Sequence, residues 1–417
     1  MKSFNYPKEL QRVFDKLFSN NIKAIIVGGF VRDYFLNIKS KDIDIELYGI
    51  DNLEALTQLL EEFGTTNSVG KSFGVCKLSY LDYDLDFSLP RRDSKVERGH
   101  RGFKIVVDTT LDFPTAAKRR DFTMNAIGYD LSTNEILDPF HGIEDLQKSI
   151  LRAVDLEQFD EDPLRFLRAV VFSVRFDLTI EQQLFNKLQT MMQQHALNEL
   201  PRERIFEEIK KLFLKTEKPS RGFYLLEELG AFAFFNEFQC LTQVQKKQIF
   251  QSLDNAVKYT HDVTDEEKLT LMLALVTVKF TLTQQESFLN KLTNNKKMLR
   301  DIKKITAIEF DLHNQTSYNI YKLAQNIDIW FYLRYLKARC NKKEMPKIES
   351  LKSKAKALGV FREKLKPFII GKDLILLGKK PSAQFSKILN EIYEKQMQGE
   401  VKSKEEAIYY LKHSSYF

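Results

Sequence analysis

The sequence has 417 residues, a net charge of +7 and an ordinary apolar fraction of 43%. This length exceeds that of one typical core, so we expect two to four domains or a long helical array. No run of eighteen apolar residues exists, which argues against a transmembrane helix, and no apolar signal core is visible near the N-terminus. The three cysteines (Cys76, Cys240 and Cys340) are far apart, which argues against a zinc site and favours thiols in a reducing cytoplasm. We expect a folded cytoplasmic protein, not bound to a membrane, whose basic excess fits a nucleic-acid partner.

The first hundred or so residues alternate between helices and short strands. Helices are expected over residues 4–20 and over residues 52–64, where Gly64 would close the second one. Residues 91–104 are dense in Arg and Lys and show no periodicity, which predicts a mobile basic loop. Strands are expected over residues 24–27, 42–46, 75–80, 83–89 and 105–107, and a further short strand over residues 135–139.

A pair of glycines follows the first strand. Gly28 and Gly29 let backbone N–H groups approach a polyphosphate closely, and the start of the next helix favours anions. Arg32 follows on that helix and can bind phosphate oxygens with two N–H groups. Because a Gly-Gly pair alone usually marks only a turn, its meaning depends on the residues around it.

The second strand carries two carboxylates in the same phase. Side chains alternate faces along a strand, so Asp42 and Asp44 share one face. Neighbouring carboxylates repel each other unless a cation lies between them, and Mg²⁺ is commonly held by one or two carboxylates plus substrate phosphates. Asp86 could supply a third carboxylate or could face solvent on a hairpin. Together with the Gly-Gly turn and Arg32, the two aspartates predict transfer of a nucleotidyl group from a triphosphate.

Residues 119–130, RRDFTMNAIGYD, place two arginines and an acid before an apolar segment. Adjacent arginines near a Gly-Gly turn favour contacts with a triphosphate and its ribose. We therefore assign Arg120 and Asp121 to the nucleotide site. Asn125 could hydrogen-bond the ribose hydroxyls or could cap a turn.

Residues 160–178 predict a helix with Asp162 at its N-cap and Pro163 in its first turn. Asp162, Arg165 and Arg168 are three residues apart and share one face. Adenine and cytosine both present an amino donor beside a ring-nitrogen acceptor, which a carboxylate and an arginine can read. Uracil and guanine would leave these charged groups unpaired, so the face could select A and C without a template. The alternative is that Asp162 only caps the helix and the arginines only pair with nearby acids.

From residue 180 onward almost every segment predicts a helix. Helices are expected over residues 201–213, 218–233, 243–258 and 264–280. The pair His261-Asp262 invites a metal-phosphohydrolase interpretation, but the six histidines are too scattered to supply the further ligands, so we expect no such site. Residues 335–366 are rich in Lys and Arg and could track a phosphate backbone or form a solvated helical face.

These motifs, in this order, resemble those of bacterial class II tRNA nucleotidyltransferases (CCA-adding enzymes) and poly(A) polymerases. The matching segments are VGGFVRD (27–33), DIDIELYG (42–49), RRDFTMNAIGYD (119–130), DPFHGIEDL (138–146), EDPLRFLRA (161–169) and PRERIFEE (201–208). The resemblance covers residues 20–235 and is closer to the CCA-adding branch. Val171 stands where many members have an arginine, and Arg175 could supply that contact.

The resemblance implies an α+β fold with an N-terminal nucleotidyltransferase head, in which a small five-stranded mixed sheet is flanked by helices. All-α parts would follow. The implied division is a catalytic head at 1–140, a neck with base recognition at 141–215, a body at 216–330 and a basic tail for tRNA binding at 331–417.

The resemblance also implies roles for individual residues. Asp42 and Asp44 would be catalytic and bind Mg²⁺. Gly29 and Arg32 would hold the triphosphate. The remaining nucleotide contacts would come from Arg120, with Asp162 and Arg165 reading the base edge and Arg168 supporting them.

The implied activity is template-independent addition of CCA to tRNA 3′ ends from CTP and ATP, with release of pyrophosphate. Alternatives in the same class are an enzyme that adds only A, one that adds only CC, and a poly(A) polymerase. An inactive tRNA-binding protein is a further alternative, but the intact Asp42 and Asp44 argue against it. A nucleotidyltransferase acting on small molecules would not need a long basic helical tail.

Overall fold

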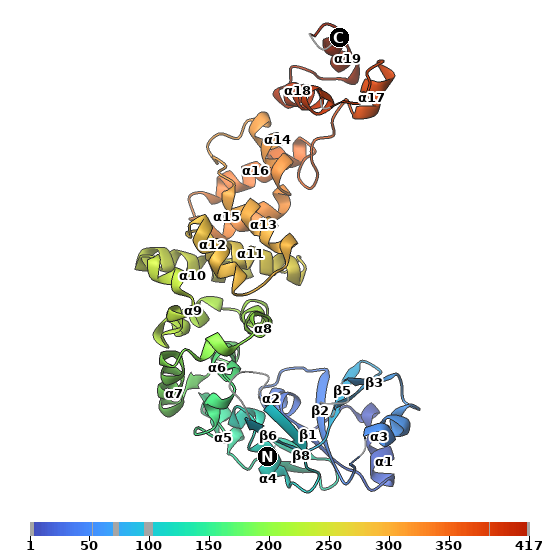
Figure 1. The fold of residues 1–417 in the computed structure, drawn as a ribbon, viewed down its shortest axis with the longest axis vertical. Helices are drawn as coiled ribbons and strands as arrows, with labels where there is room; N and C mark the ends of the chain where they lie inside the picture. Colours follow the sequence, from blue (N-terminus) through green and yellow to red (C-terminus); the bar gives the residue numbers. More distant parts are fainter. Residues whose placement is uncertain (1–3, 52, 70–74, 96–102, 383, 415–417) are drawn as a thin grey trace. The chain divides into compact units, whose positions relative to one another are not determined.

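The computed structural model describes residues 4–51, 53–69, 75–95, 103–382 and 384–414 (Figure 1). The chain divides into two compact units. Unit 1 comprises residues 1–216 and 221–236, and unit 2 comprises residues 217–220 and 237–417. All described strands lie in unit 1, and the described part of unit 2 is helical, which confirms the predicted α+β class.

Unit 1 is built on a seven-stranded mixed sheet with the order β3-β4-β5-β2-β1-β8-β9. The strands are β1 (Lys23–Val27), β2 (Asp42–Tyr48), β3 (Thr66–Val69), β4 (Val75–Tyr80), β5 (Tyr83–Ser88), β8 (Gly128–Asp130) and β9 (Glu135–Leu137). Within this sheet β2 and β5 run parallel, and the other neighbours run antiparallel. The expectation of five strands is wrong, because the sheet also contains β3, which pairs with β4 at one edge, and β8, which joins β9 to β1.

The centre of the sheet follows the predicted alternation. In β2, Ile43 and Ile45 are buried, whereas Asp42 and Asp44 are exposed. The apolar residues of β1 are all buried, as expected for a strand between two neighbours. The helices of this region are α1 (Gln11–Ser19), α2 (Gly29–Phe35), α3 (Leu53–Leu60) and α4 (Phe113–Ala117). The helix predicted at 4–20 is shorter, because Pro7 precedes a 3-10 turn (Lys8–Leu10) that leads into α1.

The basic segment after β5 is partly a hairpin. β6 (Arg91–Lys95) pairs antiparallel with β7 (Phe103–Val107). The prediction of a loop over residues 91–104 is therefore wrong for both of its ends, since strand pairing does not require an apolar alternation in one strand. The predicted mobile part, residues 96–102, lies outside the described residues.

The helices that complete unit 1 carry the remaining motifs. They are α5 (Gly142–Gln147), α6 (Leu164–Arg175), α7 (Gln182–Gln193), α8 (Arg202–Leu214) and most of α9 (Pro219–Glu228). α6 packs on α8, and its apolar stripe of Leu164, Leu167 and Val171 is buried. A short parallel pair, β10 (Ile150–Leu151) with β11 (Thr179–Ile180), was not expected.

Unit 2 contains ten described α-helices. They are α10 (Gln243–Val257), α11 (Asp265–Thr277), α12 (Leu282–Asn290), α13 (Lys296–Ala307), α14 (Ser317–Asn326), α15 (Ile329–Arg339), α16 (Met345–Ala357), α17 (Gly371–Leu376), α18 (Gln384–Gln398) and α19 (Lys404–Lys412). Thr242, Thr264 and Thr281 begin α10, α11 and α12 with capping boxes, which fixes where these helices start. None of the described helices combines the length and the apolar character needed to cross a bilayer.

Candidate active site

The two strands that carry the predicted motifs lie side by side. The antiparallel register of β1 and β2 places Val27 opposite Asp44, so the Gly28-Gly29 turn begins next to that carboxylate. Gly28 has a φ of +70°, a left-handed conformation that favours glycine. A Cβ atom on Gly28 would lie 2.9 Å from Arg120 Nη1 and 3.8 Å from Asp44 Oδ2. The absence of a side chain therefore lets an arginine and a carboxylate approach the turn together.

Carboxylates gather beside this turn. The register of β2 and β5 pairs Asp42 with Asp84 and Asp44 with Asp86. Partial withdrawal from water raises the pKa of Asp44, and although Arg120 lowers it, the charges of Asp86 and Asp42 raise it again. This local excess of negative charge favours binding of a cation.

The donor set of the pair fits a divalent metal ion. Asp42 and Asp44 offer exposed oxygen donors from a rigid strand, which suits a hard cation. Asp86 Oδ2 accepts a hydrogen bond from Lys77 Nζ at 2.5 Å, so this carboxylate is already paired. Within the described residues, no group of three or more His, Cys, Asp or Glu side chains could hold a metal ion. Substrate oxygens would complete the coordination of an ion at the two aspartates.

Glu46, which the sequence analysis did not single out, anchors both arginines of the RRD motif. Its side chain is fully buried, and its Oε2 lies 3.3 Å from Arg119 Nη2 and 3.7 Å from Arg120 Nη2. The Tyr48 hydroxyl donates to Glu46 Oε1 at 2.6 Å. Burial raises the pKa of the Tyr48 hydroxyl most, and the negative charge of Glu46 raises it further. The sequence could have indicated Glu46, because it lies on the same strand as Asp42 and Asp44 and in the same alternating phase.

A chain of buried polar groups joins α2 to α6. Arg32 Nη1 donates to Asn125 Oδ1 at 2.7 Å, and Arg32 Nε donates to Asp33 Oδ1 at 2.8 Å. Asn125 Nδ2 donates to Asp121 Oδ1 at 2.9 Å. Arg168 Nε donates to Asp121 Oδ2 at 2.6 Å. All members except Arg168 are at most 7% exposed, so the chain is part of the protein interior.

The charge of Asp121 is maintained by its partners. Burial acts to raise the pKa of this carboxyl, but the Arg168 guanidinium and the hydrogen bond from Asn125 hold it below its usual range. Asn125 therefore bridges Asp121 and Arg32. This role differs from both predicted ones, a turn cap and a contact with the ribose. The predicted contacts of Arg32, Asp121 and Asn125 with a nucleotide stay predictions.

The predicted base-reading residues have separate partners. Asp162 Oδ1 accepts the backbone N–H of Leu164 at 3.1 Å and lies 3.7 Å from Arg204 Nη1. Asp162 therefore stabilises the start of α6, whose N-cap is Pro163, one residue later than expected. Arg204 comes from the PRERIFEE segment and was not predicted to lie there.

Arg165 and Arg168 point to different groups. Arg165 Nη2 donates to the carbonyl of Arg119 at 2.8 Å, and its Nη1 donates to the carbonyl of Gln158 at 3.1 Å. Arg168 instead binds Asp121. The helix face thus holds the three predicted residues near the RRD motif without joining them into one hydrogen-bonded group.

The position of the family arginine is part of the core here. Val171 is 3% exposed and packs in the apolar stripe of α6. Arg175, one turn later, lies 4.7 Å from the centre of the Phe176 ring, and Arg32 lies 4.5 Å from the same ring. A second guanidinium therefore stands next to Arg32, although not at position 171.

Comparison with known proteins agrees with this geometry. Residues 24–152 match the family model described as the poly(A) polymerase head domain. Residues 177–240 match the model described as a probable RNA and SrmB-binding site of polymerase A. These two parts of the chain are therefore similar to the head and RNA-binding parts of the poly(A) polymerase family. Nucleotidyltransferases of this fold use a divalent metal ion, consistent with the two exposed aspartates.

Multifunctional CCA proteins are among the curated proteins that the chain is similar to. The protein of Chromobacterium violaceum is 34% identical over 212 residues, which cover 51% of this chain and 49% of the relative. The protein of Haemophilus ducreyi is 34% identical over 267 residues, covering 63% of this chain and 60% of the relative. The chain thus spans about half to three-fifths of the length of these relatives.

Solved structures show the same fold over nearly the whole chain. The Bacillus stearothermophilus CCA-adding enzyme in complex with CTP superposes with a TM-score of 0.75 at 22% identity, over 98% of both chains. The Thermotoga maritima CCA-adding enzyme complexed with tRNA gives a TM-score of 0.69 at 20% identity, over 98% of this chain and 96% of that one. The helices of unit 2 therefore belong to the shared fold as well.

Proposed function

We propose that this protein adds CCA to the 3′ ends of tRNA from CTP and ATP, without a template, and releases pyrophosphate. The observation that carries the proposal is the meeting of Gly28, Asp44 and Arg120 at the end of β1. It combines a turn open to phosphates, a carboxylate for a metal ion and a cation for the triphosphate. The multifunctional CCA proteins among its relatives favour tRNA over a small-molecule acceptor.

Mg²⁺ is the proposed ion, because it prefers oxygen ligands and is commonly shared between carboxylates and substrate phosphates. Asp42 and Asp44 would hold it. When bound, such an ion stabilises charge on the triphosphate and favours ionisation of the attacking hydroxyl. In the reaction the terminal tRNA 3′-oxygen bonds to the α-phosphorus while the bond to the pyrophosphate oxygen breaks.

The protein groups around the two aspartates orient the triphosphate. The Gly28-Gly29 turn allows its phosphates to approach the backbone, and Arg120 offers a guanidinium at the same place. The buried Glu46 carboxylate lies 3.7 Å from Arg120 Nη2, so it can hold that guanidinium in place before the substrate binds. The polar chain from Arg32 to Arg168 fixes the helix that follows the turn.

Base selection is proposed for the start of α6. Asp162 would accept a hydrogen bond from the amino group of C or A, and Arg165 would donate to the ring nitrogen. Arg165 would exchange its two backbone carbonyl partners for the base. Arg168 would support the site through Asp121. We retain the division into head (1–140), neck (141–215), body (216–330) and tail (331–417), and a cytoplasmic location, as parts of this proposal.

Primer extension tests the function directly. Three tRNA transcripts, ending at the discriminator base, at C and at CC, are incubated with Mg²⁺ and with CTP and ATP, alone and together. Completion of all three with both nucleotides is the expected result. Addition of A only to the CC-ended transcript, arrest after CC, or long A tracts on unrelated RNA would each replace the proposal with the corresponding narrower or different activity.

A further inference from the structure

Unit 2 contains a cavity of about 390 Å³ that the proposed chemistry does not use. It lies where the end of α10 and the segment after it meet α15 and α16. Four cationic side chains line it, together with Tyr259, Trp330 and Phe361. The cations are Lys258, Arg334, Lys337 and Lys352. Asp262 is the single carboxylate among the lining residues.

Trp330 is held between two guanidinium groups. The Arg334 guanidinium lies 3.5 Å from the centre of the Trp330 ring, and that of Arg362 lies 3.8 Å from it. At these distances the two groups must occupy opposite faces of the indole, because on one face they would collide. Cation–π contacts of this kind hold Arg334, the one of the two arginines that lines the cavity, in a fixed position before any ligand binds.

Arg334 is the buried cation among the residues that line this cavity. It is 9% exposed, and its Nη1 donates to the carbonyl of Trp330 at 2.7 Å. Its Nη2 binds Asp262, the acid of the His261-Asp262 pair. Its buried Nε has no hydrogen-bond partner among the described residues. The acid of this pair thus binds a guanidinium group.

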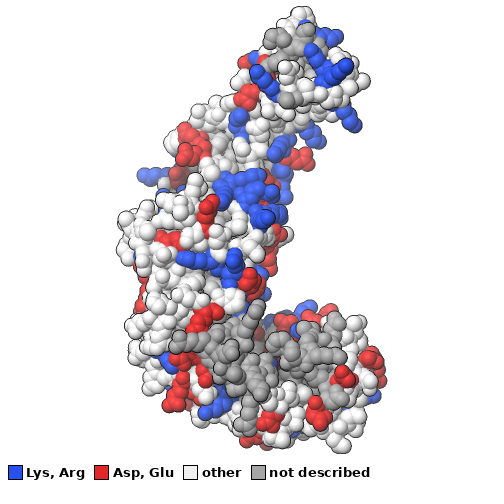
Figure 2. Space-filling model, viewed as in Figure 1, with Lys and Arg blue, Asp and Glu red and all other residues white. Residues whose placement is uncertain are grey.

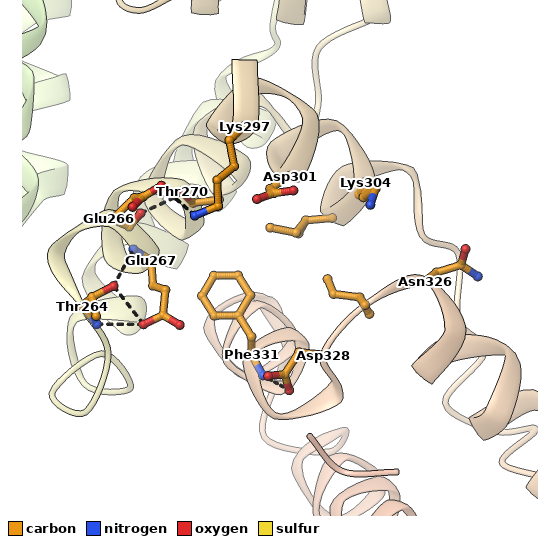
Figure 3. Close-up of a pocket in the computed structure, with 12 residues that line it drawn as sticks. Thr264, Glu266, Glu267, Thr270, Lys297, Asp301, Lys304, Asn326, Asp328 and Phe331 are labelled. Atoms are coloured by element: carbon orange, nitrogen blue, oxygen red, sulfur yellow. Dashed lines mark hydrogen bonds and ion pairs between the residues drawn. The ribbon is translucent and has the colours of Figure 1, made fainter. Parts of the chain in front are cut away.

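A second cavity in the same unit has the opposite balance of charged side chains. It also measures about 390 Å³ and is lined by Lys297 and Lys304 together with four carboxylates (Figure 3). Lys297 Nζ binds Glu266 Oε1 at 3.0 Å across its rim. Acids therefore outnumber cations there, whereas cations outnumber acids around Trp330. On the face seen in Figure 2, Lys and Arg side chains also gather over helices of unit 2.

We propose that the Trp330 cavity binds a backbone phosphate of the RNA substrate. This inference rests on the proposed function, since it takes the same RNA as ligand. Glu349 lies beside the cavity and pairs with Lys337 Nζ at 2.6 Å and, more loosely, with Lys352 Nζ at 3.7 Å. Lys258 is exposed and Lys352 is partly exposed, so both can turn to a phosphate at little desolvation cost. Isolated exposed lysines bind a small anion weakly, but each contributes when a polyanion contacts several at once. That argument favours a phosphodiester of RNA over free phosphate.

The test compares two double variants of the full chain. Lys258→Gln with Lys352→Gln removes two cations from the Trp330 cavity, and Lys297→Gln with Lys304→Gln removes two from the acid-rich cavity. Binding of a tRNA transcript is measured at several salt concentrations. The first variant should lose about tenfold in affinity and lower the salt slope by about 0.8, because one phosphate contact contributes about 0.7 to 0.9 to that slope. The control should bind like the wild type.

Trp330 gives an independent signal, because it is the sole tryptophan of the chain. Its emission should change when tRNA binds to the wild type and should change less in the Lys258→Gln, Lys352→Gln variant. Inorganic phosphate alone is titrated in parallel. If phosphate alone produces the same change and the variant binds tRNA normally, the cavity is a site for free phosphate and the inference is overturned.

Nucleotide addition at saturating tRNA separates this inference from the proposed function. If the wild type adds nucleotides but both double variants bind tRNA equally well, the proposed phosphate site is refuted and the proposed function is not. RNA binding that depends on the cavity, without any incorporation of CTP or ATP, would support the cavity and refute the function.

Discussion

Arg168 Nε donates to Asp121 Oδ2 at 2.6 Å, a contact between residues 47 positions apart in the sequence. The same carboxylate accepts a hydrogen bond from Asn125, which in turn binds Arg32. One buried acid therefore connects the helix proposed to read the base with the helix that follows the Gly-Gly turn. A substitution at Asp121 should therefore affect both helices.

Asp121→Asn should lower the free energy of unfolding by about 2 to 3 kcal/mol at neutral pH, because it leaves Arg168 without its buried counter-ion. The pKa of Asp121 is held below its usual range, so the ionised carboxylate stabilises the fold above the ordinary aspartate pKa. That contribution is lost as the pH falls through the lowered pKa. Urea unfolding at neutral and acidic pH should show the difference between wild type and variant shrinking in acid. An unchanged difference would contradict the assignment.

Glu46→Gln should raise the KM for CTP and ATP by about tenfold or more, since Arg120 loses its buried anionic partner and its fixed position. Steady-state kinetics at saturating tRNA measures this. Tyr48→Phe is the matched control, because it removes the 2.6 Å hydrogen bond to Glu46 but keeps the negative charge. Its effect on KM should be below about threefold. Equal effects of the two variants would mean that the charge of Glu46 does not position Arg120.

Asp162→Asn separates base reading from helix capping. The side-chain oxygen of asparagine accepts a hydrogen bond as that of aspartate does, so the variant should keep the hydrogen bond from the Leu164 N–H and the stability of α6. Its amide, however, presents donors as well as an acceptor to the base. We expect normal thermal stability with increased incorporation of UTP and GTP, measured with each nucleotide alone. Wild-type discrimination in Asp162→Asn, together with a loss of stability in Asp162→Ala, would mean that Asp162 only caps the helix.

Gly28→Ala should impair nucleotide addition far more than Gly29→Ala. The new methyl group at position 28 would meet Arg120 Nη1 at 2.9 Å, and the φ of +70° would add about 1 kcal/mol of backbone strain. At Gly29 the nearest group is Arg32 Nη2 at an ordinary 3.6 Å. Addition rates for both variants, at matched protein stability, test the close approach. Comparable rates would show that the turn does not need an open position at residue 28.

Local rules predicted the centre of the site. Strand alternation placed Asp42 and Asp44 on one exposed face, and the turn after β1 begins beside them. The partners of the charged side chains could not be predicted in this way. The contact between Asp121 and Arg168 depends on how α6 packs, and Glu46 becomes a counter-ion only because two arginines from a distant loop meet it.

The strand count failed for a related reason. β3 is a polar segment without an apolar alternation, and it is a strand because β4 supplies its hydrogen-bond partners. Capping residues, by contrast, are local, and the helices that they begin in unit 2 were largely expected from the sequence. Pairing between distant segments is the information that a single sequence does not display.

The most direct test of the proposed site is nucleotide addition by Asp42→Asn and Asp44→Asn, measured on a CC-ended tRNA with ATP and Mg²⁺ alongside tRNA affinity. Both variants remove a carboxylate while keeping its shape. The account predicts that incorporation of A falls by about a thousandfold or more, whereas tRNA affinity stays within about twofold of wild type. Addition at near wild-type rates in either variant would show that this pair of aspartates does not carry the reaction.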